Sequence, residues 1–403
     1  MEEWKEYQLK DICLKITDGS HKSPKAQSSG YPMFSVKDME EYGFNYNDCK
    51  LISSEDFAEM KSTGCVPEKD DILIAKDGSY LKQIFICKES REEAILSSIA
   101  IFRPDKNIIE PRFLLYLLKS PQVFNYIKTN CVSGSAIPRI VLKSFKDVYM
   151  RVPESLTEQK RISNFLEDID NKIITNRRIN ENLEAQAQAL FKSWFVDFEP
   201  FRDGEFVESE LGMIPKGWKI LSFKDFIIAS NEKAPVDSLP EYSVTNSGII
   251  PRDSKFNKKL SKSSSMNKVL RKNNLVFGMS RDILNWGIME DEIGGVSSAY
   301  NVYIIDKTKV NPTYLRLFMV AKISYFHSLI GTAAREGQSL DKGQLMQKNI
   351  YLPKYNILQD FLSIYESINN KLSTIEQESR RLATLRDTLL PRLMSGELKV
   401  NEL

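Results

Sequence analysis

Two short motifs in this sequence contain residue types that could carry out a reaction on nucleic acid. Asp70 and Asp71, followed by Lys76, have the residue types of a metal-dependent nuclease triad. Asn311-Pro312-Thr313-Tyr314 is close to the Asn-Pro-Pro-aromatic loop with which amino-methyltransferases hold a target amine, but the second proline is missing. Both motifs are candidates for an active site unless the surrounding sequence explains them structurally.

Cysteine and histidine are poorly placed for metal binding or catalysis. The five cysteines include no C-x-x-C pair and are Cys13, Cys49, Cys65, Cys87 and Cys131. The two histidines, His21 and His327, are far apart in the sequence. A zinc site or disulfide framework needs closely spaced ligands, so we expect neither a metal site nor a disulfide, and no catalytic residues. Neither a G-x-x-x-x-G-K-[ST] loop nor a G-x-G-x-x-G turn is present, so nucleotide binding has no support.

A basic segment in the second half of the chain is the main candidate for DNA binding. Residues 255–274 have no acidic side chain and seven basic ones, namely Lys255, Lys258, Lys259, Lys262, Lys268, Arg271 and Lys272. Lysines interleaved with serine and asparagine suit phosphate contacts and polar reading of base edges, although a charge run is also typical of a solvated face. In the first half the corresponding candidates are His21, Lys22, Ser23 and Lys25, in the polar run 17–25.

The chain contains one unit twice. Trp4-Lys5 returns as Trp218-Lys219, 214 residues later, and Pro111 returns as Pro312, 201 residues later. Beyond the prolines Pro153 and Pro353, matching residues stay 199 apart: Lys172, Thr175, Leu183 and Leu190 match Lys371, Thr374, Leu382 and Leu389. Each copy therefore has a globular part of variable length and a second part of constant length.

The repeat also explains the two motifs. Asp70-Asp71 and Lys76 correspond to Asn273-Asn274 and Met279, so this position is interpreted as the entrance to a strand. Asn311-Pro312 corresponds to Glu110-Pro111, and both prolines are expected in the first turn of a helix. We therefore predict structural roles for both motifs.

The constant part of each copy is predicted to be a long helix. Apolar residues recur at alternating steps of four and three, which is a heptad seam. In the first copy the seam comprises Ile162, Leu166, Ile169, Ile173, Asn176, Asn180, Leu183, Ala187, Leu190 and Trp194. In the second copy it comprises Phe361, Tyr365, Ile368, Leu372, Ile375, Ser379, Leu382, Arg386, Leu389 and Leu393. We expect the two helices, each roughly 50 Å long, to pair within the chain. The alternative is that each helix packs only in its own domain.

The globular parts are predicted to be mostly β with short helices. Strands are expected at 31–36, 71–74, 83–87 and 99–102, and helices at 111–129 and 312–330. The glycine- and proline-containing stretch 199–217 is expected to be the linker between the copies.

Length and charge limit the class of protein. A chain of 403 residues exceeds the ~250–300 residues at which one core stops growing, so we expect at least two domains. With 56 basic and 54 acidic side chains the net charge is only +2, which excludes binding of nucleic acid through overall charge. No apolar run approaches the ~18 residues of a membrane span, and the N-terminal residues lack signal-peptide features. We therefore expect a cytoplasmic protein.

The combined pattern resembles the specificity subunit of type I restriction–modification enzymes over essentially the whole chain. The run 16–24 (ITDGSHKSP), followed by Gly30-Tyr31-Pro32, is similar to the opening of the family's target-recognition domain. Residues 158–162 (EQKRI) look like the start of its first conserved helix, and 211–218 (LGMIPKGW) are similar to its entry into the second recognition domain. The second copy departs from the pattern, with 230–235 (SNEKAP) in place of the Gly-Ser-His-Lys-Ser-Pro run.

The resemblance implies an α+β architecture with an approximate internal twofold repeat. It implies two related, mostly-β target-recognition domains at 1–153 and 199–353, the latter including the linker. Spacer helices at 154–198 and 354–403 would form an antiparallel intramolecular coiled coil. The implied function is recognition of a bipartite, asymmetric double-stranded DNA site by a subunit that is not itself an enzyme.

The implied partners are two methyltransferase subunits, which modify adenine N6 with S-adenosylmethionine, and restriction subunits, which use ATP and magnesium. No cofactor is implied for this chain. Two alternatives remain open: a tandem adaptor that binds protein or glycan, and a DNA nuclease or methyltransferase with an unrecognised motif.

Overall fold

The chain forms two compact units joined by two long helices. The computed structural model describes residues 3–77, 83–133, 139–234, 239–252, 266–278, 283–330 and 340–402. Unit 1 comprises Met1–Arg178 and Thr374–Leu403, and unit 2 comprises Ile179–Ser373. Each long helix therefore contributes one part to each unit. No described helix is both long and apolar enough to cross a membrane.

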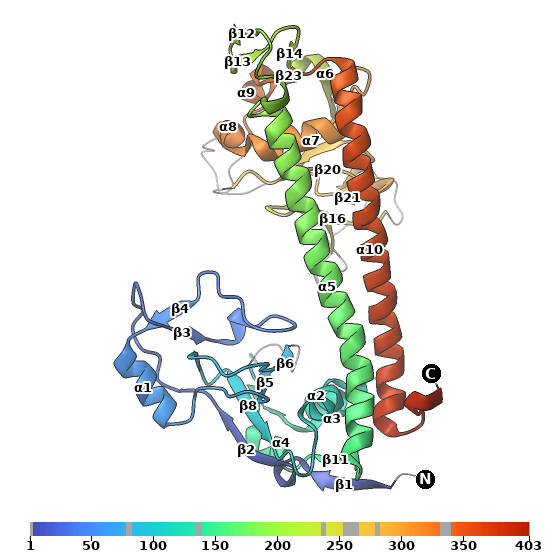
Figure 1. Cartoon of the computed structure of the whole chain (residues 1–403). Coiled ribbons are helices and arrows are strands. Elements are labelled where there is room, and N and C mark those ends of the chain that lie inside the picture. Colours follow the sequence, from blue (N-terminus) through green and yellow to red (C-terminus); the bar gives the residue numbers. More distant parts are fainter. Residues whose placement is uncertain are drawn as a thin grey trace. The chain divides into compact units, whose positions relative to one another are not determined.

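Unit 1 is built around an antiparallel four-stranded sheet with the order β2-β8-β5-β6. The strands are β2 (Cys13–Asp18), β8 (Ile99–Pro104), β5 (Ile72–Ala75) and β6 (Ile84–Ile86). All four residues of β5 are buried, as expected for a short apolar run in the middle of a sheet. The helix α2 (Pro111–Lys119) lies between this sheet and the long helix α5 (Figure 1) and shares a core with both.

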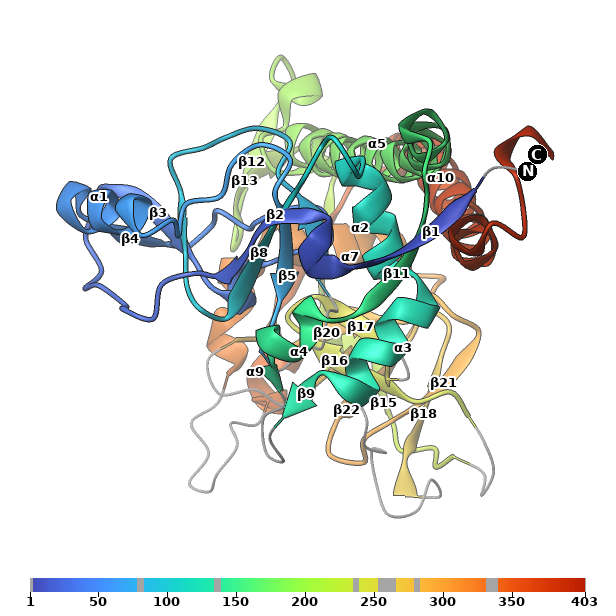
Figure 2. The ribbon, with the colours of Figure 1, turned by 90° about the horizontal axis from the view of Figure 1, so that it is seen from below.

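Smaller elements complete unit 1. The strand β1 (Trp4–Gln8) pairs with β11 (Tyr149–Pro153), and a second sheet has the order β4-β3-β7. The remaining elements are β3 (Tyr31–Phe34), β4 (Lys50–Ile52), β7 (Ala94–Ile95), β9 (Val132–Ser133), β10 (Arg139–Ile140), α1 (Ser54–Ser62), α3 (Pro121–Asn130) and α4 (Leu142–Lys146). Figure 2 shows β9 and α4 on the side of unit 1 away from α5.

Unit 2 repeats the four-stranded sheet of unit 1 and its pairing of the first strand with the last, whereas its smaller sheets differ. Its four-stranded sheet has the order β15-β22-β19-β20, formed by β15 (Ile227–Ser230), β22 (Asn301–Ile305), β19 (Leu275–Phe277) and β20 (Trp286–Ile288). The strand β14 (Lys219–Ser222) pairs with β23 (Asn349–Leu352), as β1 pairs with β11. Its other elements are β16 (Tyr242–Thr245), β17 (Gly248–Pro251), β18 (Lys268–Arg271), β21 (Ile293–Val296), α6 (Phe223–Phe226), α7 (Pro312–Ala321), α8 (Ile323–Phe326) and α9 (Lys342–Gln347). The repeat found in the sequence therefore corresponds to two copies of the same central fold.

The predicted long helices are α5 (Leu156–Phe195) and α10 (Tyr355–Ser395), with Pro391 inside the second. In unit 1, Ile162 and Leu166 of α5 share a core with Leu389 and Leu393 of α10. In unit 2, the Phe195 and Phe361 rings lie 4.8 Å apart between centroids. The start of each helix therefore packs against the end of the other, which makes the pair antiparallel.

The seam residues face inward along both helices. Every residue of both predicted seams is buried or half-buried, whereas most intervening residues of α10 are exposed. Asn176 interrupts the apolar seam, and its Nδ2 donates to Glu378 Oε2 at 2.7 Å and to Ser379 Oγ at 3.3 Å. A polar group at such a position restricts the helices to the register in which it finds a partner.

Two expectations about local structure are wrong, and the expected linker contains an unexpected hairpin. The predicted helix at 111–129 is two helices, because Pro121 cannot continue α2 and begins α3 instead. Its counterpart at 312–330 is divided at Lys322 into α7, α8 and a 3-10 turn. The stretch 199–217 contains a paired hairpin, β12 (Phe206–Ser209) and β13 (Gly212–Pro215), in which Gly212 adopts φ 91°. Glycine tolerates this left-handed conformation, so the residue predicted to mark a linker forms a tight turn.

Candidate nucleic-acid interface

The nuclease-like residues of unit 1 do not converge on one site. Asp70 adopts a left-handed conformation with φ 71° just before β5, and Asn273 does the same with φ 67° before β19. Asp71 accepts two 2.8 Å hydrogen bonds from Arg103, while Lys76 pairs with Asp18. Among the described residues, no group of three or more histidine, cysteine, aspartate or glutamate side chains could hold a metal ion. The motif marks a strand entrance, as predicted.

The methyltransferase-like loop is a helix cap. The Asn311 side chain accepts hydrogen bonds from the backbone N–H groups of Thr313 and Tyr314, at 2.9 and 3.2 Å. In unit 1 the Glu110 side chain caps α2 in the same way, accepting from Phe113 N at 2.9 Å. These residues satisfy backbone donors that a helix leaves unpaired at its start.

The capping role predicts the effect of Asn311→Ala. The substitution should lower the free energy of unfolding by ~1 kcal/mol, because the α7 N-terminus loses its side-chain acceptor. Chemical denaturation of the purified chain measures this loss. Asn311→Asp is the matched control and should retain most of the stability, since aspartate caps equally well. Equal losses in both variants would contradict the capping role.

The cysteines are not arranged as nucleophiles. All five are free thiols, and Cys65, Cys87 and Cys131 are buried. Burial raises the pKa of Cys13 to about 12 and also raises the pKa of Cys87. A thiol with a raised pKa contains little thiolate at neutral pH, so these side chains act as small apolar groups.

The candidate loop of unit 1 is exposed, but its charges are largely paired. His21 Nε2 lies 3.5 Å from Asp18 Oδ2, and the His21 side chain is 72% exposed. Lys22 Nζ donates to Glu59 Oε2 at 2.5 Å, and Ser23 Oγ accepts from Lys50 Nζ at 3.0 Å. Residues 17–22 and α1 line a cleft of about 360 Å³. The loop is therefore a polar surface without a marked excess of positive charge.

The structure brings further charged residues to this loop. Lys76 is buried and forms an ion pair with Asp18 at the end of β2. The next residue, Asp77, accepts hydrogen bonds from Arg139 Nε and Nη2, each at 2.7 Å. We call Asp18, His21, Lys76, Asp77 and Arg139 the charged cluster of unit 1. Sequence reasoning missed Asp18, Asp77 and Arg139 as site residues, because no local pattern connects positions 18, 77 and 139.

The candidate basic segment of unit 2 falls only partly within the described residues. Lys255, Lys258, Lys259 and Lys262 lie outside them. Lys268, Arg271 and Lys272 lie on or beside β18. Arg271 pairs with Glu232 and Lys272 with Glu292, which balances both charges.

Three lysines gather at the start of β18. Lys268 faces Lys233 across a β-bridge and donates to the Tyr300 carbonyl at 2.7 Å. Burial lowers the pKa of Lys268, and the positive charge of Lys342 lowers it further. Lys233 and Lys342 are exposed and form no ion pair with any described residue. We call Lys233, Lys268 and Lys342 the lysine cluster of unit 2; its uncompensated charge suits phosphate oxygens.

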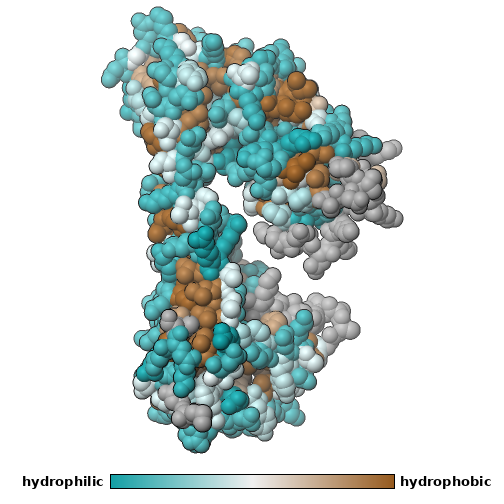
Figure 3. Space-filling view, turned by 90° about the vertical axis from the view of Figure 1, so that its right-hand side faces the viewer, coloured by the Kyte–Doolittle hydropathy of each residue, from teal (hydrophilic) through white to brown (hydrophobic). Residues whose placement is uncertain are grey.

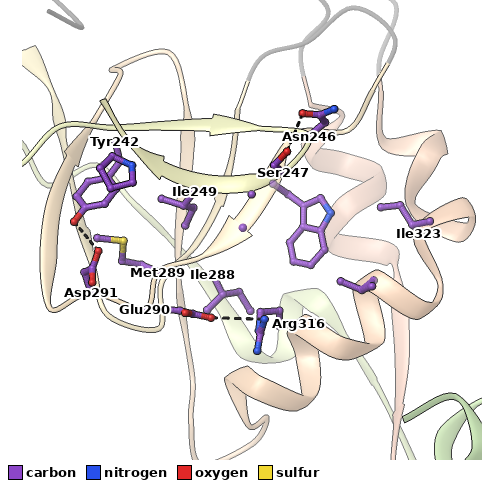
Figure 4. Close-up of a pocket in the computed structure, with 15 residues that line it drawn as sticks. Tyr242, Asn246, Ser247, Ile249, Ile288, Met289, Glu290, Asp291, Arg316 and Ile323 are labelled. Carbon is purple, nitrogen blue, oxygen red and sulfur yellow. Dashed lines mark hydrogen bonds and ion pairs between the residues drawn. The ribbon is translucent and has the colours of Figure 1, made fainter. Parts of the chain in front are cut away.

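A larger pocket in unit 2 has a different character. It has a volume of about 620 Å³ and lies between the β16–β17 hairpin, β20 and α7–α8 (Figure 4). Glu290 pairs with Arg316 at 3.6 Å, and Asp291 accepts from the Tyr242 hydroxyl at 2.7 Å. Two carboxylates against one arginine give this pocket no attraction for phosphate. On the face seen in Figure 3, hydrophilic residues cover most of each unit and apolar residues form separate patches.

Comparison with known proteins shows that the chain is similar to type I restriction enzyme specificity subunits. Residues 1–185 match the model described as the type I restriction modification DNA specificity domain. The chain is 29% identical over 315 residues to the type I restriction enzyme MjaIX specificity subunit of Methanocaldococcus jannaschii, covering 74% of this chain and 71% of that one. It is 31% identical over 208 residues to the HindI specificity subunit of Haemophilus influenzae, covering 50% of this chain and 43% of the relative.

A solved structure shares the fold. The S subunit of a type I restriction-modification system from M. genitalium superposes with a TM-score of 0.54, covering 97% of this chain and 96% of that chain. The sequences are 13% identical, so this likeness concerns the fold. It extends over both units and both long helices.

Proposed function

Because this chain is a homologue of the type I restriction enzyme specificity subunits, we propose that it reads a bipartite DNA site for a restriction–modification complex. Unit 1 recognises one part of the site and unit 2 recognises the other. The paired helices α5 and α10 set the distance between the two parts. The chain is the targeting subunit, and catalysis belongs to its partners.

The main support for this proposal is that the two units share a central fold but present different polar surfaces. The four-stranded sheets of the two units correspond in strand order, β2-β8-β5-β6 in unit 1 and β15-β22-β19-β20 in unit 2. Unit 1 presents a charged cluster of mixed sign, whereas unit 2 presents three neighbouring lysines. Two related readers with different side chains suit an asymmetric site, since base-edge contacts carry sequence information and phosphate contacts position the protein.

The partners we propose are double-stranded DNA, two methyltransferase subunits and restriction subunits. The methyltransferase subunits would use S-adenosylmethionine to modify adenine N6, and the restriction subunits would use ATP and magnesium. The long helices are the proposed docking elements for the methyltransferases, since α5 and α10 continue through both units.

Mapping methylated adenines in the source genome, with the gene intact and with it deleted, tests this function. The expected result is a two-part motif with a fixed spacer that disappears on deletion. A methylation pattern that does not change on deletion would contradict the proposal. Purified chain alone, incubated with DNA, magnesium and S-adenosylmethionine, should show no turnover; cleavage or methylation would favour an enzyme instead.

The lysine cluster of unit 2 predicts a change in salt dependence. Lys233→Ala and Lys342→Ala should each weaken DNA binding to all sequences similarly. Each should also reduce the slope of log affinity against log salt concentration by about 0.9, because one fewer counterion is released. Fluorescence anisotropy of the full complex at several salt concentrations measures both effects. Lys219→Ala is the control, since Lys219 is an exposed lysine of unit 2 that lies on β14, outside the cluster. An unchanged slope would exclude these lysines as phosphate contacts.

A further inference from the structure

Arg139 is held by Asp77 in an orientation that leaves part of its guanidinium group available. Asp77 accepts from Nε and Nη2, so the carboxylate occupies one side of the planar group. The Arg139 side chain is 53% exposed and the Asp77 side chain 19% exposed. Among the described residues, none accepts a hydrogen bond from Arg139 Nη1. The Nη1 hydrogens and the outer Nη2 hydrogen therefore form an end-on fork directed away from Asp77.

The backbone around this pair fixes its position. Asp77 and Arg139 face each other in an antiparallel β-bridge, and Ile140 N donates to the Lys76 carbonyl at 3.0 Å. Behind the pair, buried Lys76 is held by Asp18, whose charge also acts on Arg139. The hydrogen bond and charge of Asp77, followed by the charge of Asp18, raise the pKa of Arg139. The arginine is thus a permanently charged donor on a fixed backbone.

The two carboxylates determine which DNA group suits this arginine. Because Asp77 balances the charge of Arg139 and Asp18 balances that of Lys76, these four side chains have no excess positive charge to attract a phosphate. A base edge is neutral, and guanine presents O6 and N7 as two neighbouring acceptors in the major groove, which match an arginine fork. The ion pair itself adds little stability, because exposed pairs rarely do. Its effect is to restrict the rotamers of Arg139 before DNA binds, which lowers the entropy cost of a specific contact.

The pair is specific to unit 1. The helix α4 begins two residues after Ile140, and α9 begins two residues after Leu340. The residue before Ile140 is Arg139 and the residue before Leu340 is Ser339. Counting from the matched motifs that precede β5 and β19, Asp77 corresponds to Ser280. Ser280 and Ser339 lie outside the described residues, so this comparison concerns sequence alone. A pair needed for the common fold should occur in both copies, whereas a base-reading pair should differ.

We propose that Arg139 reads a guanine in the part of the site that unit 1 recognises, with Asp77 as its positioning residue. This inference rests on the proposed function and adds a base and a residue to it. The contact is a bidentate hydrogen bond from the guanidinium fork to guanine O6 and N7. Its expected contribution to base preference is roughly 5- to 150-fold at one position.

The test uses the full chain assembled with its two methyltransferase subunits and a library of randomised DNA duplexes. Bound duplexes are sequenced for wild type, Arg139→Gln, Arg139→Lys and Asp77→Asn. Wild type should select guanine at one position that both Arg139 variants relax, while every other position stays unchanged. Asp77→Asn should relax the same position less, because the arginine remains but loses its restraint. Arg91→Gln is the matched control, since Arg91 is an exposed arginine of unit 1 paired with Glu89.

The outcomes separate the inference from the proposed function. If both Arg139 variants select the wild-type motif unchanged, Arg139 does not read a base. A uniform loss of affinity with a smaller salt slope would make it a phosphate contact, which also overturns the inference. In either case the proposed function stands as long as the wild-type protein selects a two-part DNA motif. If wild type itself selects no motif, the proposed function fails. If Arg139→Gln lowers the melting temperature and so destabilises the chain, the base preferences of Arg139→Lys and Asp77→Asn still test whether Arg139 reads a base.

Discussion

Replacing Arg386 with leucine should lower the free energy of unfolding by about 3–5 kcal/mol, which is a large part of the stability of a typical domain. Arg386 lies in the predicted seam of α10, and its Nη1 donates to Asp170 Oδ1 of α5 at 2.6 Å. Both side chains belong to unit 1 and are 17% and 7% exposed. Removing the arginine leaves the Asp170 carboxylate buried without its cation, and the resulting penalty exceeds the loss of the pair alone.

The surrounding residues make this ion pair a network. The Tyr116 hydroxyl of α2 donates to Asp170 Oδ2 at 2.8 Å, and the Tyr42 hydroxyl donates to Asp170 Oδ1 at 3.3 Å. Burial alone would lower the pKa of Arg386, but the hydrogen bond and charge of Asp170 raise it above its ordinary value. The network therefore ties α2 and the loop containing Tyr42 to the paired helices within unit 1.

Chemical denaturation of the single and double variants checks this prediction. Arg380→Leu is the matched control on the same helix; Arg380 is 75% exposed and pairs with Glu376, so its loss should cost at most about 0.5 kcal/mol. Combining Arg386→Leu with Asp170→Asn should recover part of the loss, because the buried charge is removed while Tyr116 keeps an acceptor. A loss no larger than that of Arg380→Leu would show that the network does not stabilise unit 1.

Unit 2 packs on the same helices, and among its described residues no ion pair corresponds to Arg386 and Asp170. Ala187 is the counterpart of Arg386 at the constant repeat distance of 199 residues. Near it, Phe191, Phe195 and Phe361 form an aromatic cluster with Tyr314, whose ring lies 5.3 Å from that of Phe195. Both units therefore pack on the helices through an apolar core, and unit 1 adds a buried ion pair at the position where unit 2 has Ala187.

Features that depend on local periodicity could be predicted from the sequence. The seam of α5 follows from steps of four and three residues, and the helix starts at Pro111 and Pro312 follow from the fixed φ of proline. The break in the predicted helix at Pro121 could have been predicted by the same reasoning, since proline has no backbone N–H to donate within a helix. The hairpin at 206–215 could not be predicted in this way, because its strands are too short to show a recognisable alternation of polar and apolar residues.

Features that depend on distant pairings could not be predicted. The ion pairs Asp18–Lys76, Asp77–Arg139 and Asp170–Arg386 each join residues that are at least fifty positions apart. A single charged residue has no periodicity, and many oppositely charged partners are available along the chain. Only the fold selects among them, so the candidate site in unit 1 emerged from the structure and not from the basic residues of its loop.

Lengthening both long helices should change the spacing of the recognised DNA site. Four residues inserted between Arg178 and Ile179, and four between Ser373 and Thr374, fall where the chain passes from one unit to the other, so each unit keeps its own contacts. The insertion adds about 6 Å of helix, which corresponds to ~1–2 base pairs of DNA. Methylation mapping should show the same two half-sites with a spacer longer by that amount. Affinity for the original site should fall at least about 100-fold, because one half-site loses its matched base pairs at ~1–3 kcal/mol each.

A second insertion length separates a rigid spacer from a flexible connection. Seven residues in each helix preserve the heptad phase and add about 10 Å, or ~3 base pairs, whereas four residues introduce a stutter that the coiled coil accommodates by local unwinding. A rigid helix pair predicts one new spacer for each length, increasing with the insertion. A flexible connection would instead accept several spacers, including the original one, since a chain of variable extension reaches many distances. An unchanged spacer with both insertions would therefore show that something other than α5 and α10 determines the distance between the two half-sites.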